Sequence, residues 1–376
     1  MGVLQRMTDP RSPNPLPLTA YALSHAARVG AYFALYRMST RRITPVKPAR
    51  PIEGPTPDAS RILRDLQGLF ERDWANIRAG RYRMPHDLLH APIAALRGAP
   101  AYFRDLAAVE ARRHAGRSQD VARDMPGAGY PRYYRQNFHF QSDGWFSHES
   151  AQRYDHQVEV LFGGGADAMR RQALVPLHQW IEAHGVRRRR LVDLASGTGR
   201  FLTFVKDNYP RLHVTALDLS PHYLDRARRN LRSWRHVDHV HARAEATGLP
   251  DASQDLVTSI YLFHELPKKI RRQVAREAFR ILAPGGRLIL MDSIQRGDNP
   301  DYDGLLEYFP VAFHEPYYWD YVTSDILRLF EETGFRHVAT DVAFFSRVMV
   351  FDKTAAGDAI QGRLPTSRRT YTRARG

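Results

Sequence analysis

From residue 190 onward, short apolar runs alternate with helical segments, and this alternation constrains the fold more than any other feature. Apolar runs that predict buried strands lie at 191–194, 212–218, 237–242, 256–262 and 287–292. Helical periodicity separates most of these runs, which is typical of a doubly wound parallel sheet. The last two runs, 337–344 and 347–352, are joined too tightly for a parallel crossover. We therefore predict an α/β fold with a seven-stranded, mostly parallel sheet whose last strand is antiparallel.

The N-terminal third has almost no strand signal. Helical spacing of apolar residues predicts helices over 18–36, 59–79 and 86–114, followed by a loop over 116–130. The chain is expected to divide into a helical accessory region, pre-core helices, a sheet-forming core that carries an insertion, and a basic tail. These parts are residues 1–130, 131–185, 186–353 with the insertion at 293–322, and 354–376.

Composition narrows the class of protein. Of 376 residues, 43% are hydrophobic and 25% charged, as in an ordinary soluble globular chain. The absence of cysteine excludes disulfides, zinc–thiolate sites, iron–sulfur clusters and a cysteine nucleophile. The net charge of +15 suggests an anionic partner, but 50 of the 55 basic residues are arginine and they are spread along the whole chain. That bias is typical of a GC-rich genome rather than of a binding surface.

Membrane association is predicted to be peripheral at most. No apolar run reaches the roughly 20 residues of a membrane span, and His25 and Arg28 interrupt the best one, 18–36. That segment is expected to form an amphipathic helix that lies on a membrane or packs on the core. The arginine-rich first fifty residues also allow a transit peptide. We expect a cytoplasmic protein, with membrane contact through the N-terminal helix or the basic tail left open.

The first strand of the core leads into a glycine turn and a helix. Gly197 and Gly199 carry no side chains, so a ligand can approach the backbone at the helix N-terminus. Asp218 ends the next strand, where doubly wound folds bind ribose hydroxyls. A nicotinamide-binding turn needs a third glycine, and residues 197–202 read G-T-G-R-F-L. This disfavours NAD.

Here the chain resembles the class I S-adenosylmethionine-dependent methyltransferases, which have a Rossmann-like core. Residues 193–199, D-L-A-S-G-T-G, follow the family's acid-x-Gly-x-Gly-x-Gly turn, with Ala195 in place of the first glycine. Asp218, E-A-T-G-L-P at 245–250, D-L-V at 255–257 and R-I-L-A-P-G-G at 280–286 follow in the family's order. The resemblance does not extend to residues 1–135.

The resemblance implies S-adenosylmethionine as cofactor and assigns roles to individual residues. Asp193 would orient the turn and the cofactor's amino group, Asp218 would accept from the ribose, and Glu245 would accept the adenine amino group. The implied cofactor-binding residues are Asp193, Ala195, Ser196, Gly197, Gly199, Asp218, Leu219, Glu245, Ala246 and Tyr261. The alternative is that each acid only caps a helix or ends a strand.

Methyl transfer from a sulfonium needs alignment of the reactants, and it needs a base only if the acceptor must lose a proton. The candidate bases are His264, at the end of the fourth strand, and His314, in the insertion. Aromatic residues of the insertion suit a flat or apolar acceptor, and the candidates for its pocket are Tyr308, Phe313, Tyr317 and Trp319. A packed surface lobe is the alternative.

A second aromatic stretch, 133–146, precedes the core, and Tyr154 lies on a segment that resembles the family's lid helix. Its alternative role is an aromatic seam between the accessory helices and the core. His236, Asp238, His239 and His241 have metal-ligand side chains, but they fall on the expected edge strand, where polar residues discourage edge pairing. No metal is predicted.

The expected function is transfer of a methyl group from S-adenosylmethionine to a small acceptor that is aromatic or lipid-like. The core looks similar to the quinone C-methyltransferases. The charge of +15 favours an RNA methyltransferase as the first alternative. Ala195 is the one hint of a second alternative, a non-catalytic binding or scaffold protein. Nothing in the sequence indicates an oligomeric state.

Overall fold

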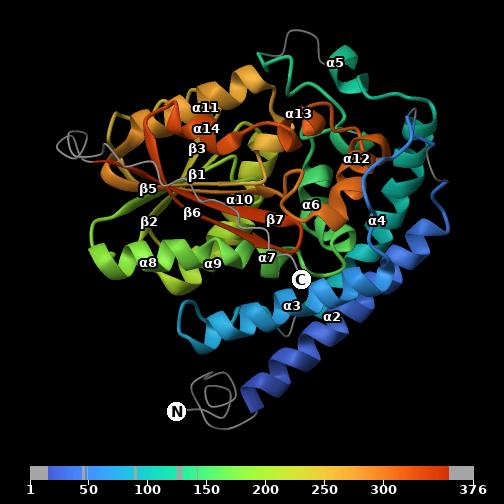
Figure 1. Cartoon of the computed structure of the whole chain (residues 1–376), viewed down its shortest axis with the longest axis horizontal. Helices are drawn as coiled ribbons and strands as arrows, with labels where there is room; N and C mark the ends of the chain where they lie inside the picture. The colour runs from blue at the N-terminus through green and yellow to red at the C-terminus, as the bar shows by residue number, and fades with distance from the viewer. Residues whose placement is uncertain are drawn as a thin grey trace, which may run out of the picture.

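The computed structural model describes residues 16–44, 47–48, 50–88, 91–124, 129–141 and 143–354. Its seven-stranded sheet has the order β3-β2-β1-β4-β5-β7-β6. The strands are β1 (Arg190–Leu194), β2 (His213–Asp218), β3 (Val237–His241), β4 (Gln254–Ile260), β5 (Leu282–Ser293), β6 (Phe335–Ala343) and β7 (Ser346–Lys353). Only β7 runs antiparallel to its neighbours (Figure 1). The predicted α/β fold with a mostly parallel sheet is confirmed.

Helices cover both faces of the sheet, because successive side chains of each buried strand point to opposite sides. Leu191 and Ala216 belong to the core on one face, and Val192 and Leu217 to the core on the other. The first face is covered by α8 (Leu174–His184), α9 (Arg200–Asn208) and α10 (Pro221–Leu231), and the second by α11 (Lys268–Ile281) and α14 (Ile326–Glu331).

Local sequence explains how the chain turns at the carboxyl edge of the sheet. Gly199 precedes α9 with φ +72°, a left-handed conformation that favours glycine. A Cβ there would lie 3.0 Å from Leu231 and 3.1 Å from Ala227, so this glycine also lets α9 approach α10. Ser220 caps α10 by accepting a hydrogen bond from the Tyr223 amide at 3.3 Å, with Pro221 in the first turn.

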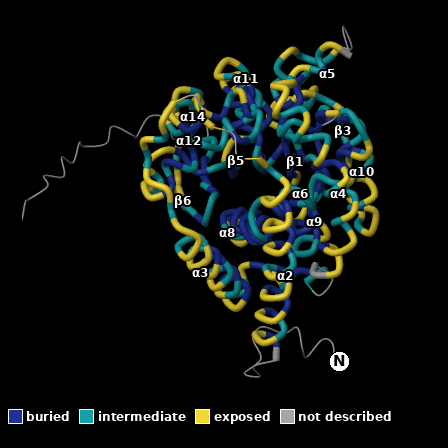
Figure 2. The backbone as a smooth tube through the Cα atoms, turned by 90° about the vertical axis from the view of Figure 1, so that its right-hand side faces the viewer, coloured by how far each residue is buried: buried dark blue, intermediate teal, exposed yellow. Residues whose placement is uncertain are grey.

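The part of residues 1–130 that the structure describes is helical and contains no strand. Its helices are α2 (Leu16–Thr40), α3 (Ala59–Arg78), α4 (Ala91–His114) and α5 (Asp120–Asp124), followed towards the core by η2 (Phe138–Phe140), α6 (His148–Leu161) and α7 (Ala166–Gln172). The helix predicted from residue 86 begins at Ala91, and α5 lies inside the predicted loop 116–130. Figure 2 shows the buried backbone inside the molecule and exposed residues along α2 and α3.

Buried polar contacts dock α2 on α3 and on the pre-core helices α6 and α7. Arg28 of α2 reaches Asp167 of α7 at 2.8 Å and Glu159 of α6 at 2.5 Å. Tyr21 donates to Asp73 of α3 at 2.6 Å. Because these polar groups are enclosed and paired, they fix where α2 lies. The predicted helix 18–36 therefore packs on neighbouring helices along one side.

The insertion between β5 and β6 forms η4 (Pro300–Tyr302), α12 (Asp303–Ala312) and α13 (Tyr318–Val322). The Tyr321 hydroxyl donates to the Ser293 carbonyl at 2.7 Å, and the Tyr302 hydroxyl donates to Asp65 of α3 at 2.8 Å. The insertion is thus packed between the sheet and the accessory helices.

Two expectations concern the ends of the chain and membrane crossing. The predicted basic tail, 354–376, lies outside the described residues from position 355 onward, as do residues 1–15. Within the described ranges, none of the helices combines the length and the apolar character that crossing a membrane requires.

Candidate active site

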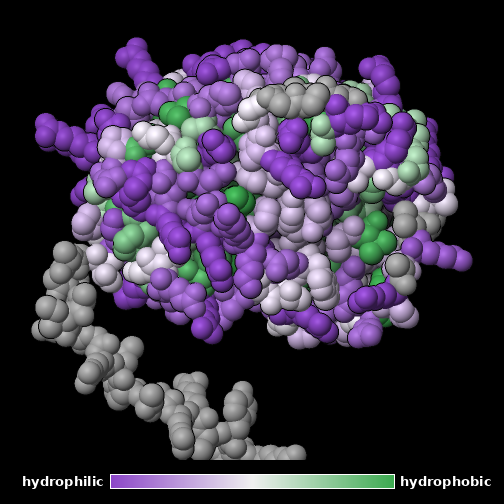
Figure 3. All heavy atoms as spheres, turned by 90° about the horizontal axis from the view of Figure 1, so that it is seen from above, coloured by the Kyte–Doolittle hydropathy of each residue, from purple (hydrophilic) through white to green (hydrophobic). Residues whose placement is uncertain are grey.

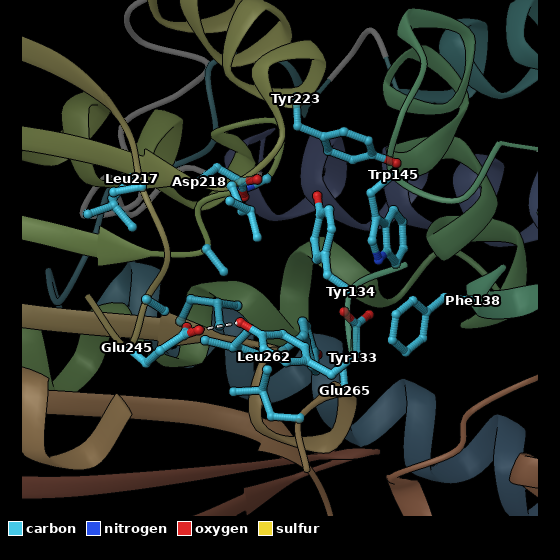
Figure 4. A pocket seen from close by; sticks show the side chains of 18 of the residues that line it. Tyr133, Tyr134, Phe138, Trp145, Leu217, Asp218, Tyr223, Glu245, Leu262 and Glu265 are labelled. Carbon is cyan, nitrogen blue, oxygen red and sulfur yellow. Dashed lines mark hydrogen bonds between the residues drawn. The ribbon is translucent and has the colours of Figure 1, made fainter. Parts of the chain in front are cut away.

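A cavity of about 90 Å³ lies at the carboxyl ends of β1, β2 and β4. This is the edge where doubly wound folds bind ligands. Its strand-end wall is formed by Ala195, Gly197, Leu217, Asp218, Leu219, Ala242, Ala244, Glu245, Ile260, Tyr261, Leu262, Glu265 and Leu266. Its other wall is aromatic, made of Tyr133, Tyr134, Phe138, Trp145, Tyr154 and Tyr223 (Figure 4). Most small-molecule sites measure about 300–1,000 Å³, so this cavity is smaller than usual.

Asp218 ties the glycine turn to the start of α10. Its two carboxylate oxygens accept hydrogen bonds from the Gly197 and Ser220 amides, both at 2.8 Å. Burial raises the pKa of Asp218 to about 6, although these amide bonds favour the charged form. The carboxylate is 8% exposed and lines the cavity. It therefore shapes the turn and also faces a ligand.

Some of the other residues of the glycine turn line the cavity, and the rest pack inside the protein. Gly197 has φ +55°, lines the cavity, and a Cβ there would meet only Tyr223, at 4.0 Å. Ala195 also lines the cavity and has φ +57°. Gly199 instead faces α10, and Ser196 does not line the cavity. We expected Gly199 to make room for the ligand. In the structure, glycine at this position instead makes room for Leu231 and Ala227 of α10.

Asp193 lies behind the turn rather than in the cavity. It is 1% exposed, and its Oδ1 accepts a hydrogen bond from the Thr258 hydroxyl at 2.6 Å. Burial raises the pKa of Asp193 to about 7, because no positive charge compensates the carboxylate. The side chain joins β1 to β4 directly below the turn.

Glu245 faces Asp218 across the cavity and is already hydrogen-bonded to an aromatic residue. The Tyr133 hydroxyl donates to Glu245 Oε1 at 2.7 Å, and Oε2 is buried without a hydrogen-bond partner (Figure 4). The amide of Ala246 donates to the Arg243 carbonyl at 3.1 Å, and the residue is exposed outside the cavity. Ala246, implied by the resemblance as a cofactor-binding residue, therefore does not offer its amide to a ligand in this structure.

Hydrogen bonds hold the aromatic segment over the cavity. Ser220 donates from its hydroxyl to the Trp145 carbonyl at 2.6 Å. Thr198, in the glycine turn, donates to Asp155 of α6 at 2.9 Å. These bonds place Tyr154 in the cavity wall, as the resemblance to a lid helix implied. The sequence signal for this wall was the aromatic stretch 133–146.

The four aromatic residues expected to line the acceptor pocket lie elsewhere. None of Tyr308, Phe313, Tyr317 and Trp319 lines the cavity. Trp319 is 43% exposed, and the Tyr317 hydroxyl accepts from Gln136 at 2.9 Å. Phe313 packs on Phe309 with ring centroids 4.8 Å apart. Tyr308, Phe313 and Tyr317 are half-buried, and Tyr317 packs against the cluster of Phe138, Trp145 and Tyr223. The four residues therefore do not line this cavity, and an acceptor pocket at the insertion stays a prediction.

Neither candidate base lines the cavity. His264 Nδ1 lies 2.5 Å from Asp292 Oδ1. Burial alone would lower the pKa of His264, but Asp292 and the nearby Glu315 and Glu265 outweigh it and raise this pKa to about 10. An imidazole that holds its proton at neutral pH cannot accept another, which argues against His264 as a base.

His314 also lies outside the cavity. Its Nε2 is 2.8 Å from Gln136 Oε1, and burial lowers the pKa of its ring. The residues weighed as a metal site at 236–241 lie on and before the edge strand β3, where His213 contacts Asp238 at 2.7 Å. They form no three-ligand group among the residues that the structure describes.

Comparison with known proteins agrees with this geometry. Residues 191–286 match a family model described as "Methyltransferase domain". The ubiquinone/menaquinone biosynthesis C-methyltransferase UbiE of Methylobacterium nodulans is 33% identical over 160 residues, 42% of this chain and 61% of that protein. The demethylmenaquinone methyltransferase of Thermus thermophilus is 33% identical over 145 residues, 38% of this chain and 62% of its own.

More distant matches are also named as methyltransferases. The demethylspheroidene O-methyltransferase of Rhodobacter capsulatus is 30% identical over 113 residues, 30% of this chain and 28% of its own. A solved methyltransferase from Aquifex aeolicus, described as SAM-dependent, aligns with 15% identity and a TM-score of 0.38, covering 55% of this chain and 98% of its own. The chain spans about three fifths of the length of the first two relatives. Residues 191–286, which run from β1 into β5 of the sheet, are therefore similar to a methyltransferase domain.

Proposed function

We propose that the protein transfers a methyl group from S-adenosylmethionine to a small aromatic or lipid-like acceptor. The observation that carries this proposal is the cavity at the carboxyl edge, which has the glycine turn and Asp218 on one side and Glu245 on the other. The relatives named for ubiquinone/menaquinone biosynthesis, demethylmenaquinone and demethylspheroidene support an acceptor of this class.

The residues present fit the cofactor. Glu245 Oε2 is a buried acceptor without a partner, suited to an adenine amino group. Leu217 and Leu262 offer apolar surface for a flat base, and Gly197 leaves room beside the backbone for the ribose and methionine parts. Asp218 has a carboxylate facing the cavity for the ribose hydroxyls.

In the proposed mechanism, the residues of the chain align the cofactor with the acceptor and exclude water from the site. When bound, the cofactor supplies a methyl group on a sulfonium that is ready for in-line displacement. Asp218 would hold its ribose and Glu245 its adenine, and the aromatic wall would exclude water and pack against an apolar acceptor. Tyr133 occupies only Oε1 of Glu245 and leaves Oε2 to the adenine amino group, so the Tyr133 side chain would have to move only if the amino group took Oε1.

One experiment separates the three functions. The full chain is incubated with methyl-labelled S-adenosylmethionine and either a quinone-containing lipid extract or bulk tRNA and rRNA. We expect label in the lipid fraction only. Label in RNA, with affinity that falls steeply with salt, would establish the RNA alternative. Calorimetric titration showing no binding of S-adenosylhomocysteine would favour the non-catalytic alternative.

We also propose that α2 and α4 touch a membrane surface. These two helices lie side by side, and Leu23 and Leu96 are 66% and 68% exposed. Leu18, Phe33 and Ile93 add further exposed apolar area. By contrast, the face in Figure 3 is mostly hydrophilic, with apolar residues in small groups. Apolar side chains of this kind insert between lipid headgroups.

Vesicle sedimentation tests this contact. Leu23→Glu combined with Leu96→Glu is expected to abolish binding to vesicles that contain anionic lipid. Leu63→Glu on α3, where Leu63 is 44% exposed, serves as the matched control and should bind like wild type. Equal sedimentation of all three proteins would contradict the proposed surface.

A further inference from the structure

Three side chains with metal-ligand chemistry converge beside the cofactor cavity. They are His139 of η2, Glu265 at the end of η3 (Phe263–Glu265), and Glu315 between α12 and α13. One ligand atom from each lies within 4.8 Å of the other two. The three come from separate parts of the chain, so tertiary packing and not a sequence motif brings them together.

Glu315 supplies independent evidence that a ligand belongs there. It is 2% exposed, and neither of its carboxylate oxygens has a hydrogen-bond partner. Its Oε1 lies 3.0 Å from His139 Nε2, but without the geometry of a hydrogen bond. A buried carboxylate without hydrogen bonds is unfavourable, because nothing replaces the water that it has lost. A bound cation would satisfy both oxygens.

The ion pairs around the cluster leave its carboxyl groups open to a cation. Asp292 contacts His264, with Oδ1 and Nδ1 2.5 Å apart, and not the cluster. Among the residues that the structure describes, His139 is the one basic side chain within ion-pair distance of Glu315, at 3.0 Å, and Glu265 has none. Two carboxyl groups and an imidazole therefore share an enclosed space, where a bound cation would favour the deprotonated form of each ligand.

We propose that His139, Glu265 and Glu315 bind a divalent transition-metal cation. The imidazole nitrogen favours Zn²⁺, Mn²⁺ or Fe²⁺ over Mg²⁺ and Ca²⁺, which prefer oxygen ligands alone. Three protein ligands leave coordination positions open, as in metal sites that bind a substrate or water. Phe138, the neighbour of His139, lines the cofactor cavity together with Glu265.

The position of Glu265 gives the cation a role in selecting the acceptor. Because this residue also lines the cavity, an open coordination position there can hold an oxygen of the acceptor, such as a phenol or enol oxygen. This part of the inference rests on the proposed methyltransferase function. It narrows the acceptor class to molecules that carry such an oxygen near the methylated atom.

The test is titration of the untagged full chain, freed of metal by a chelator, with Mn²⁺ and separately with Zn²⁺. Calorimetry should give one site per chain with micromolar affinity, and Mn²⁺ binding should appear as loss of the free-ion electron paramagnetic resonance signal. Glu315→Gln and Glu265→Gln should each weaken binding by at least about 100-fold, since even groups outside the coordination sphere contribute 10- to 100-fold.

The controls make each outcome decisive. Glu182→Gln alters a surface histidine–glutamate pair, His178 and Glu182 at 3.2 Å, and should leave the affinity unchanged. Thermal melting reports whether each variant folds, and the second glutamate variant stands in if the first does not. No binding to wild type, or equal binding by all variants, would overturn the site. S-adenosylhomocysteine is titrated in parallel, so that failure of the methyltransferase proposal is seen separately.

Discussion

At the scale of single residues, one side chain both lines the cavity and holds the backbone of the glycine turn in place. Asp218 faces the cavity, but both of its oxygens also accept backbone amides. Ala195 takes a left-handed conformation where the family has glycine, so a change that looks minor in sequence lies at a strained position. Both residues lead to predictions that only the geometry makes specific.

Asp218→Ala should weaken S-adenosylhomocysteine binding by roughly 10- to 150-fold, because a hydrogen bond to a charged group contributes about 1.5–3 kcal/mol. Asp218→Asn should also bind weakly, since its amide group must face either the Gly197 or the Ser220 amide, and both are donors. Calorimetry measures the affinity and melting curves the fold. Asp325→Asn, at the cap of α14, is the matched control. Wild-type affinity in a folded Asp218→Ala protein would exclude the ribose role.

Ala195→Gly should raise the free energy of unfolding by up to about 1 kcal/mol. The left-handed conformation costs a non-glycine residue roughly 1–2 kcal/mol, and the greater freedom of glycine in the unfolded chain offsets part of the gain. Ala252→Gly, at φ +49° and away from the cavity, should stabilise similarly without changing ligand affinity. Urea unfolding measures both variants. A destabilised Ala195→Gly protein would show that the alanine methyl makes a packing contribution larger than the strain.

At the scale of elements, the segment from Tyr133 to Tyr154 acts as a wall that belongs to no strand of the sheet. It reaches Glu245 through the Tyr133 hydroxyl, and its backbone is held by the hydroxyl of Ser220. Its rings line the cavity that is proposed to take the cofactor. If the wall moves when the cofactor binds, the measured affinity includes the free energy of that movement.

Tyr133→Phe removes the hydroxyl that is bonded to Glu245. If the adenine amino group takes the same oxygen, this variant should bind S-adenosylhomocysteine more tightly, by up to about 10-fold for a hydrogen bond of about 1.4 kcal/mol. Tyr317→Phe loses a hydroxyl that contacts Gln136 outside the cavity and should show no change. Calorimetry compares the three proteins. Weaker binding by Tyr133→Phe would mean that the hydroxyl itself contacts the ligand.

At the scale of the whole molecule, the carboxylates under the site link stability to pH. Burial raises the pKa of Asp193 to about 7, far above its value of 3.8 when unperturbed. The folded protein therefore binds a proton at Asp193 that the unfolded chain has released between these two values. Stability from this group is complete below about pH 4 and is lost as the pH rises towards 7, with a slope of about 1.4 kcal/mol per pH unit.

Asp193→Asn should reduce the dependence of the free energy of unfolding on pH by the contribution of about one proton. The amide does not titrate in this range, and it still accepts the hydrogen bond from Thr258. Urea unfolding between about pH 5 and pH 8 provides the measurement. Wild type should lose stability more steeply than the variant as the pH rises to 7. Burial also raises the pKa of Glu265 to about 7, so some slope should remain in Asp193→Asn. Parallel curves for the two proteins would mean that Asp193 is already ionised in the fold.

Much of the fold was predictable, because its signals are local. The strand before Asp193, the glycine turn and the helix after it follow from apolar runs and turn residues that lie next to each other in sequence. The tight junction between the last two strands predicted the antiparallel strand, and the polar residues of 237–241 predicted the sheet edge. The same local pattern placed Asp218 at the end of a strand, and the family resemblance pointed to Glu245 in the loop after β3; both residues line one cavity.

The tertiary structure alone decided what surrounds that edge. Two aromatic stretches were candidates for the cavity wall, and residues of 133–154 line the cavity while Phe313 packs on Phe309 and Trp319 is exposed. The pairing of His264 with Asp292, which changes its protonation, and the meeting of His139 with Glu265 and Glu315 join positions far apart in the chain. Sequence periodicity reports which face of an element is apolar, but not which distant segment covers that face, because the covering contacts depend on how all elements pack together.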